Sequence, residues 1–229
     1  MKFLQKLLLI TISLALTDDI SCQYGIRTKY NVNTLTKADE GLDEFFNDEA
    51  IARRGFGIGL DYWFRLKNYR VEFMPELYYG MNTSDFESEF ITSSTLSRFG
   101  FNFNTHFYLM DLEEDCDSPT FSKEGPNITK GLFFHISPGV SYDMLKMDSS
   151  SGQVNNNEHF NLKIGGGIGL DIGVSDLLTI TPIYTYNYFF GGDWVLSNFP
   201  NGAEPILNFK STQAQHQFAL RVGIRLDYK

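Results

Sequence analysis

The chain has 229 residues, of which 15% are aromatic, and its formal net charge is −9. This acidic balance lacks the basic footprint of a nucleic-acid-binding protein, so we exclude nucleic acid as a partner. Beyond the N-terminal segment the length is sufficient for one large all-β domain, and no stretch is apolar for the ~20 residues that a spanning helix needs.

The N-terminus has the pattern of a secretory signal peptide. Lys2 and Lys6 precede a short apolar segment, which is the arrangement of an exported protein. We expect cleavage after Cys22, so that residues 1–22 are the signal peptide and residues 23–229 form the mature domain. Lipidation of Cys22 is the alternative.

Alternation of apolar and polar residues with a period of two recurs through the mature chain, in runs of about ten or more residues. Such runs are longer than most strands of soluble proteins and match the length of a membrane strand. They predict eight strands, at about 24–33, 53–64, 69–79, 95–109, 131–144, 159–174, 178–189 and 215–228.

The connections between these strands predict the orientation. Long connections at 34–52, 80–94, 145–158 and 190–214 alternate with short ones, and the short turns of a membrane barrel face the periplasm. The acidic segment 110–130 departs from this scheme, because it is long where a short turn is expected.

Each strand has one bulky apolar face and one polar face that contains glycine and charges of both signs. A soluble lipocalin-like barrel would place the apolar face inside, whereas a membrane barrel places it outside. Eight strands enclose room for a single layer of side chains, so the many rings fit better against lipid. The polar face then lines a filled lumen. Its predicted charges are Arg27, Lys29, Arg70, Arg98, Lys163, Arg221 and Arg225, with Asp61, Glu72, Glu76, Asp143, Asp171 and Asp227.

A repeated segment supports this assignment of faces. Gly57–Tyr62, Gly167–Ile172 and Gly223–Tyr228 share the pattern Gly-Ile-x-Leu-Asp. In each copy Gly and Asp fall on the lumen face and Ile and Leu on the lipid face.

The C-terminal residues Arg221, Gly223, Leu226 and Tyr228 have the spacing polar, x, Gly, x, x, apolar, x, aromatic. This spacing resembles the insertion signal that the outer-membrane assembly machinery recognises. Together with the signal peptide and the strand count, it makes the chain similar to the small porin-like or OmpA-like outer-membrane β-barrel family.

The resemblance implies an eight-stranded antiparallel up-and-down transmembrane β-barrel in the cell outer membrane of a Gram-negative bacterium. Its implied partners are outer-membrane lipid, lipopolysaccharide and the assembly machinery. The resemblance specifies architecture and leaves the activity open.

The sequence indicates no cofactor, because the alternating glycines are not followed by the helix of a phosphate-binding loop. The histidines form no metal cluster by spacing. His135-Ile136-Ser137 is similar to the His-x-Ser pair of lipid A deacylase barrels, but Pro138 stands where that family has Asn.

We predict a non-enzymatic barrel with a structural or surface-interaction role through its long outer loops, where a protein partner could bind. An accessory barrel of a secretion or surface-assembly system is the alternative, and a lipid A-modifying hydrolase is a further one.

Overall fold

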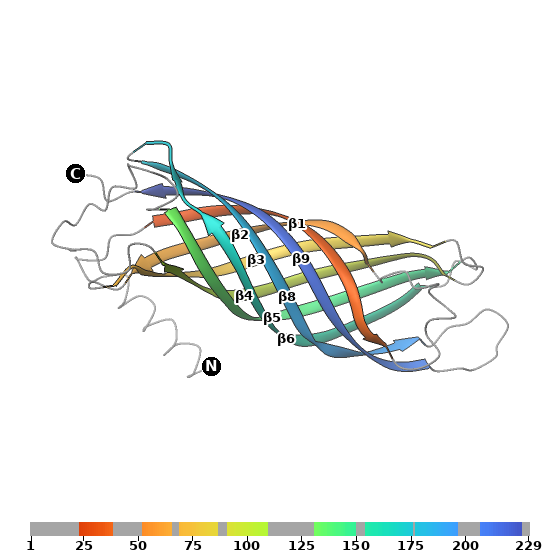
Figure 1. Ribbon diagram of the computed structural model, residues 1–229. Helices are drawn as coiled ribbons and strands as arrows, with labels where there is room; N and C mark the ends of the chain where they lie inside the picture. The colour runs from red at the N-terminus through yellow and green to blue at the C-terminus, as the bar shows by residue number, and fades with distance from the viewer. Residues whose placement is uncertain are drawn as a thin grey trace, which may run out of the picture.

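The computed structural model describes residues 23–38, 52–65, 69–86, 91–109, 131–149, 154–175, 177–196 and 207–225. In these residues the chain forms long, tilted antiparallel strands around a common axis (Figure 1). No helix in the described part of the chain is long and apolar enough to cross a membrane.

The strands of the described residues form one closed sheet. They are β1 Gln23–Ala38, β2 Arg54–Arg65, β3 Val71–Asp85, β4 Ile91–Tyr108, β5 Leu132–Ser149, β6 Val154–Leu170, β7 Ile172–Gly173, β8 Leu178–Leu196 and β9 Leu207–Arg225. Except for β6 and β7, neighbours in the chain pair with one another; in addition β1 pairs with β9, and β6 pairs with β8. Because β7 continues β6 after a break at Asp171 and also pairs with β8, the two act as one strand. This confirms the predicted eight-stranded antiparallel barrel.

Every predicted strand is present, but several are longer than predicted. The expected long connections 80–94 and 145–158 are mostly strand. β3 continues to Asp85 and β4 begins at Ile91, while β5 continues to Ser149 and β6 begins at Val154. In the extension of β5 the apolar side chains face inward instead of outward: Leu145 and Met147 point inward, whereas Lys146 points to solvent. The predicted strands were therefore too short, because the prediction relied on outward apolar residues.

The strand order distinguishes the two ends of the barrel, which we name after the predicted orientation. Gln23 of β1 pairs with Arg225 of β9, so the first and last described strands start and finish at the same end. The β2–β3 turn and the turn after β7 lie at this end, which we call the inner end. The extended β3–β4 and β5–β6 hairpins form the opposite, outer end.

The exterior carries an apolar band. Outward residues such as Phe160, Phe56 and Leu162 are 81%, 72% and 63% exposed. The large exposed apolar residues of the strands include Tyr24, Ile26, Ile58, Leu60, Leu77, Tyr79, Met81, Phe99, Phe101, Phe103, Phe134, Ile136, Val140, Ile164, Ile168, Tyr186, Phe218, Leu220 and Ile224. Toward the outer end this band gives way to exposed polar residues, among them Thr83, Asp85 and Glu158.

Candidate functional site

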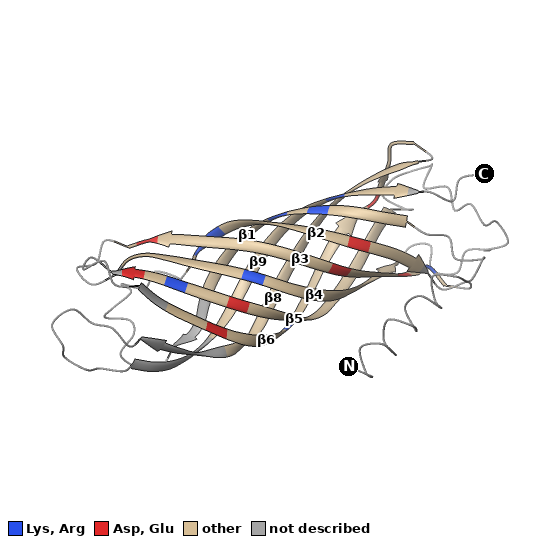
Figure 2. Cartoon of the chain, turned by 180° about the vertical axis from the view of Figure 1, so that it is seen from behind, with Lys and Arg blue, Asp and Glu red and all other residues tan. Residues whose placement is uncertain are grey.

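The barrel lumen gathers the charged residues of the strands. Figure 2 shows Lys, Arg, Asp and Glu positions along the strands in the middle of the barrel as well as at its ends. Among the described side chains, those of Arg27, Lys29, Arg70, Arg98, Lys163, Arg221, Asp61, Glu72, Glu76, Asp143 and Asp171 are buried inside. The side chain of Arg225 and residue Asp227, which we also predicted to face the lumen, lie outside what the structure describes.

A network of aromatic and acidic side chains lies near the inner end. The Trp63 indole donates to Glu72 Oε2 at 2.7 Å, and the Tyr108 hydroxyl donates to the same oxygen at 2.8 Å. Tyr108 and Thr181 both hydrogen-bond Asp171. The network therefore joins β2, β3, β4 and β8 across the lumen, and its rings narrow this end.

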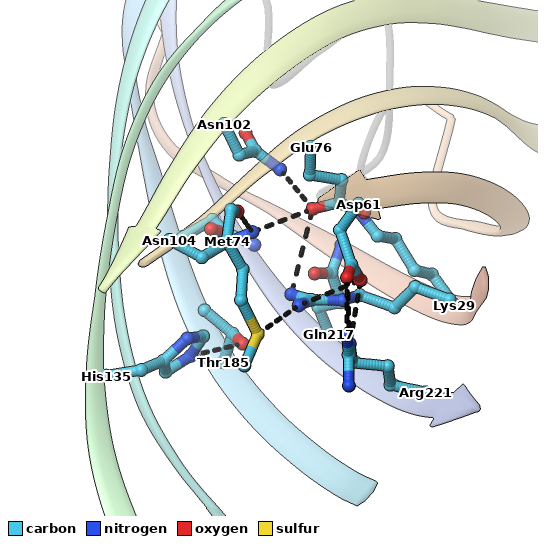
Figure 3. A network of polar contacts seen from close by, with 12 residues as sticks. Lys29, Asp61, Met74, Glu76, Asn102, Asn104, His135, Thr185, Gln217 and Arg221 are labelled. Carbon is cyan, nitrogen blue, oxygen red and sulfur yellow. Dashed lines mark hydrogen bonds and ion pairs between the residues drawn. The ribbon is translucent and has the colours of Figure 1, made fainter. Parts of the chain in front are cut away.

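Charged side chains from four strands, β1, β2, β3 and β9, form a connected chain just above this network. Arg221 donates to Asp61 through Nε at 2.9 Å and Nη2 at 2.7 Å. Arg27 lies between two carboxylates, 3.4 Å from Asp61 and 3.7 Å from Glu76. Lys29 closes the chain at 2.6 Å from Glu76. Figure 3 shows Lys29, Asp61, Glu76 and Arg221 gathered in the lumen.

Polar amides complete the coordination of the central carboxylate. Asn102 and Asn104 donate to Glu76 Oε2 at 3.0 and 3.1 Å. A buried carboxylate is costly unless cations and hydrogen-bond donors surround it. Glu76 has both, so its charge is compensated inside the barrel.

A second ion pair lies closer to the outer end. Arg98 makes a two-pronged contact with Asp143, at 2.8 and 2.9 Å, and donates to Gln213 at 2.8 Å. Its guanidinium also stacks over Phe189, 3.7 Å from the ring centroid. Planar pairing of this kind fixes the orientation of the arginine.

Lys163 differs from these cations. Its ammonium donates to Asn187 Oδ1 at 3.1 Å and lies 5.5 Å from the Tyr78 ring centroid. No carboxylate of the described residues pairs with it.

Lumen glycines make room for these long side chains. A Cβ at Gly139 would lie 2.6 Å from Asn102 Oδ1, and one at Gly100 would lie 2.7 Å from the Tyr78 ring. A Cβ at Gly59 would collide with the Glu76 carboxylate. The alternating glycines therefore have a steric role in the lumen.

The His-x-Ser motif faces the lumen near the inner end. His135 and Ser137 are both buried there, and His135 Nε2 bonds Thr185 Oγ1 at 2.8 Å. In the described residues no hydrogen bond joins His135 to Ser137, so the pair lacks the contact that activates a serine nucleophile. The described residues also contain no group of three or more His, Cys, Asp or Glu that could hold a metal ion.

The rings that face inward were not predicted from the sequence. Trp63, Phe133 and Phe189 are buried in the lumen, although we had placed bulky rings outside. Their positions in the strands indicate the inward direction, because Trp63 is two residues from Asp61 and Phe133 two residues from His135, and residues two apart share a face of the strand. The insertion-signal residues Leu226 and Tyr228 lie outside the described residues, whereas Arg221 and Gly223 belong to β9.

A charged interior inside an apolar exterior is the reverse of a soluble barrel and is the arrangement of a transmembrane one. The protein is therefore an integral β-barrel of the outer-membrane type, as the sequence predicted.

No known family model matches the sequence, and no curated protein matches it. Solved structures with a similar fold include Neisserial surface protein A, at 9% identity and a TM-score of 0.49, covering 90% of this chain and 97% of that one. Ail of Yersinia pestis, bound to the heparin analogue sucrose octasulfate, has 13% identity and a TM-score of 0.44, covering 88% and 99% of the two chains. The N-terminal β-barrel domain of Pseudomonas aeruginosa OprF has 12% identity and a TM-score of 0.37, covering 85% and 96%.

Proposed function

We propose that this protein is a non-enzymatic outer-membrane barrel with a filled, non-conducting lumen, which acts through its outer end as a structural or surface-interaction protein. The observation that carries the proposal is the layered lumen. Rings of Trp63 and Phe133 lie near the inner end, charged side chains, most of them paired, lie in the middle, and the apolar side chains of Leu145 and Met147 lie near the outer end. An eight-stranded barrel has little space left beyond such layers.

The outer mouth supports the same proposal. Ala52 is fully buried and has a positive φ of 54°, which is uncommon for alanine. Its N–H donates to Ser94 Oγ at 3.1 Å, and its carbonyl accepts from Asn33 Nδ2 at 2.7 Å. The adjacent Arg53 N–H donates to Ser84 Oγ at 2.6 Å. These contacts hold the start of β2 against β1, β3 and β4 at the mouth.

Planar-bilayer recording tests the filled lumen. We expect the refolded protein to give no stable steps, while a general porin added to the same bilayer reports that insertion and conduction are detected. Stable nanosiemens-scale steps from the purified barrel would overturn the proposal of a closed lumen.

The role at the outer end is tested separately. Intact barrels would be purified from native membranes after mild cross-linking, and the recovered proteins compared with those from a variant whose residues 39–50 are replaced by a Gly-Ser segment of equal length. Partners lost with the replacement support a loop-borne interaction, and large secretion or assembly proteins among them would identify an accessory role. An identical set from both forms would contradict it.

We also propose that residues 1–22 are removed on export and that the C-terminal pattern is the insertion signal. Arg221 is a poor probe of the signal, because its substitution also removes the Asp61 ion pair. Tyr228→Ala is the informative change. We expect it to lower the fraction of heat-shifted, folded barrel in cells while refolding in detergent stays normal, and equal assembly in cells would count against the signal.

A further inference from the structure

His216 lies on the outer surface of the barrel, within the apolar band. On β9 it follows the outward residues Ile224, Val222, Leu220 and Phe218 in the direction of the outer end. Its ladder partners are Val32 on β1 and Tyr186 on β8. The side chain is only half-buried. A polar ring that faces hydrocarbon is costly and is therefore a candidate for function.

Two tyrosines hold the imidazole in place. The Tyr184 hydroxyl and His216 Nδ1 are 2.8 Å apart. The Tyr186 ring packs edge-on against the imidazole at 5.2 Å, and the Tyr184 ring lies at 6.2 Å. The ring is thus oriented by its neighbours.

The direction of this hydrogen bond and the tautomer of the imidazole depend on each other. We take the arrangement in which the Tyr184 hydroxyl donates its proton to His216 Nδ1. A neutral imidazole then carries its own proton on Nε2. Nε2–H becomes a donor with no acceptor in the described part of the protein.

We propose that His216 Nε2–H binds an acyl-linkage carbonyl, ester or amide, of a lipid in the surrounding outer leaflet. The depth of the residue fits this acceptor. On β1 the outward apolar Val32 is followed by the exposed Thr34, and Val32 pairs on its other side with the exposed Arg54. On the β1 side the outward apolar residues thus end just beyond His216, which is the pattern expected at the level where acyl chains join their headgroups. Phosphate groups would then lie further out, on the side of Arg54.

The test compares bilayers with and without these carbonyls. The protein would be refolded in nanodiscs of a diester phosphatidylcholine or of its diether analogue with the same chains and headgroup. We expect the wild-type unfolding midpoint to be higher in the ester lipid by about 2–4 °C, as one hydrogen bond implies for a protein of this size. His216→Leu should remove the difference. Thr105→Leu, an outward polar-to-apolar change on β4, is the matched control and should keep it.

Nitrogen-15 spectra of the imidazole give a second readout. We expect a protonated Nε2 whose proton resonance moves between ester and ether discs, and Tyr184→Phe should change the tautomer balance. Adding lipopolysaccharide to the outer leaflet identifies the source, since a larger effect indicates its ester or amide groups and an unchanged effect indicates phospholipid esters. An ester–ether difference equal in wild type and His216→Leu would overturn the proposal, as would a Nε2 resonance that does not respond to lipid. These outcomes are independent of whether the lumen conducts.

Discussion

Removal of the Asp61 carboxylate is the sharpest test of the charged lumen. Asp61 accepts the hydrogen bonds of Arg221 and also lies 3.4 Å from Arg27. All these side chains are at most 3% exposed. In Asp61→Leu, Arg27 keeps Glu76 at 3.7 Å, but Arg221 loses its carboxylate. Leaving one buried charge without its partner costs about 3–5 kcal/mol, and we expect a loss of this size in the free energy of unfolding.

The assay is equilibrium urea unfolding of the barrel in lipid vesicles, followed by tryptophan fluorescence and by the gel shift on heating. The double variant Asp61→Leu, Arg221→Met should recover much of the loss, because it removes both charges. Lys146→Ala is the control: its pair with Asp148, at 3.3 Å, is 54% and 38% exposed, so its loss should cost less than about 1 kcal/mol. Equally small losses for Asp61→Leu and Lys146→Ala would refute the idea of a dry lumen, since water would then be screening the buried charges.

Three further changes have defined outcomes. Gly59→Leu should prevent formation of the heat-shifted barrel, because its side chain would overlap the Glu76 carboxylate, whereas Gly166→Leu should fold normally, since a Cβ there is 4.0 Å from its nearest neighbour and faces lipid. Ala52→Gly should raise the free energy of unfolding by about 0.5–1 kcal/mol in the urea assay, because it relieves the positive φ. Ser137→Ala should leave lipid A acylation unchanged by mass spectrometry on overexpression, and a loss of acyl-chain removal would restore the hydrolase hypothesis.

The positions of the strands were predictable because lipid favours a period of two in the residues of each membrane-spanning strand. In β4, Phe99, Phe101 and Phe103 face outward while Asn102 faces the lumen, and this contrast is visible in the sequence alone. The outer extensions were not predictable in the same way. There the outward side meets water, so the apolar residues move to the inward positions and the contrast that marks a lipid-facing strand reverses.

The identity of the lumen residues followed from parity, but their partners did not. Arg221 and Asp61 are 160 residues apart, on β9 and β2, which are separated by β1. Their contact depends on the stagger between strands and on the room left by glycine: a Cβ at Gly25 of β1 would lie 2.5 Å from Asp61 Oδ1. Neither the stagger between strands nor this space can be derived from the sequence of one strand. The inward rings of Trp63 and Phe133 were not predicted because large rings were expected to face lipid, although the alternation along their strands places both on the lumen face.

The reversal of the apolar and polar faces along β4 and β5 explains the asymmetry of the molecule. Ladder hydrogen bonds are made by the backbone and continue as long as one face of the strand is buried. In the membrane, lipid covers the outward apolar residues; beyond it, Leu96, Leu145 and Met147 are buried inside while Thr95 and Lys146 meet water. The barrel therefore continues past the lipid at its outer end as a wall with a soluble-type pattern.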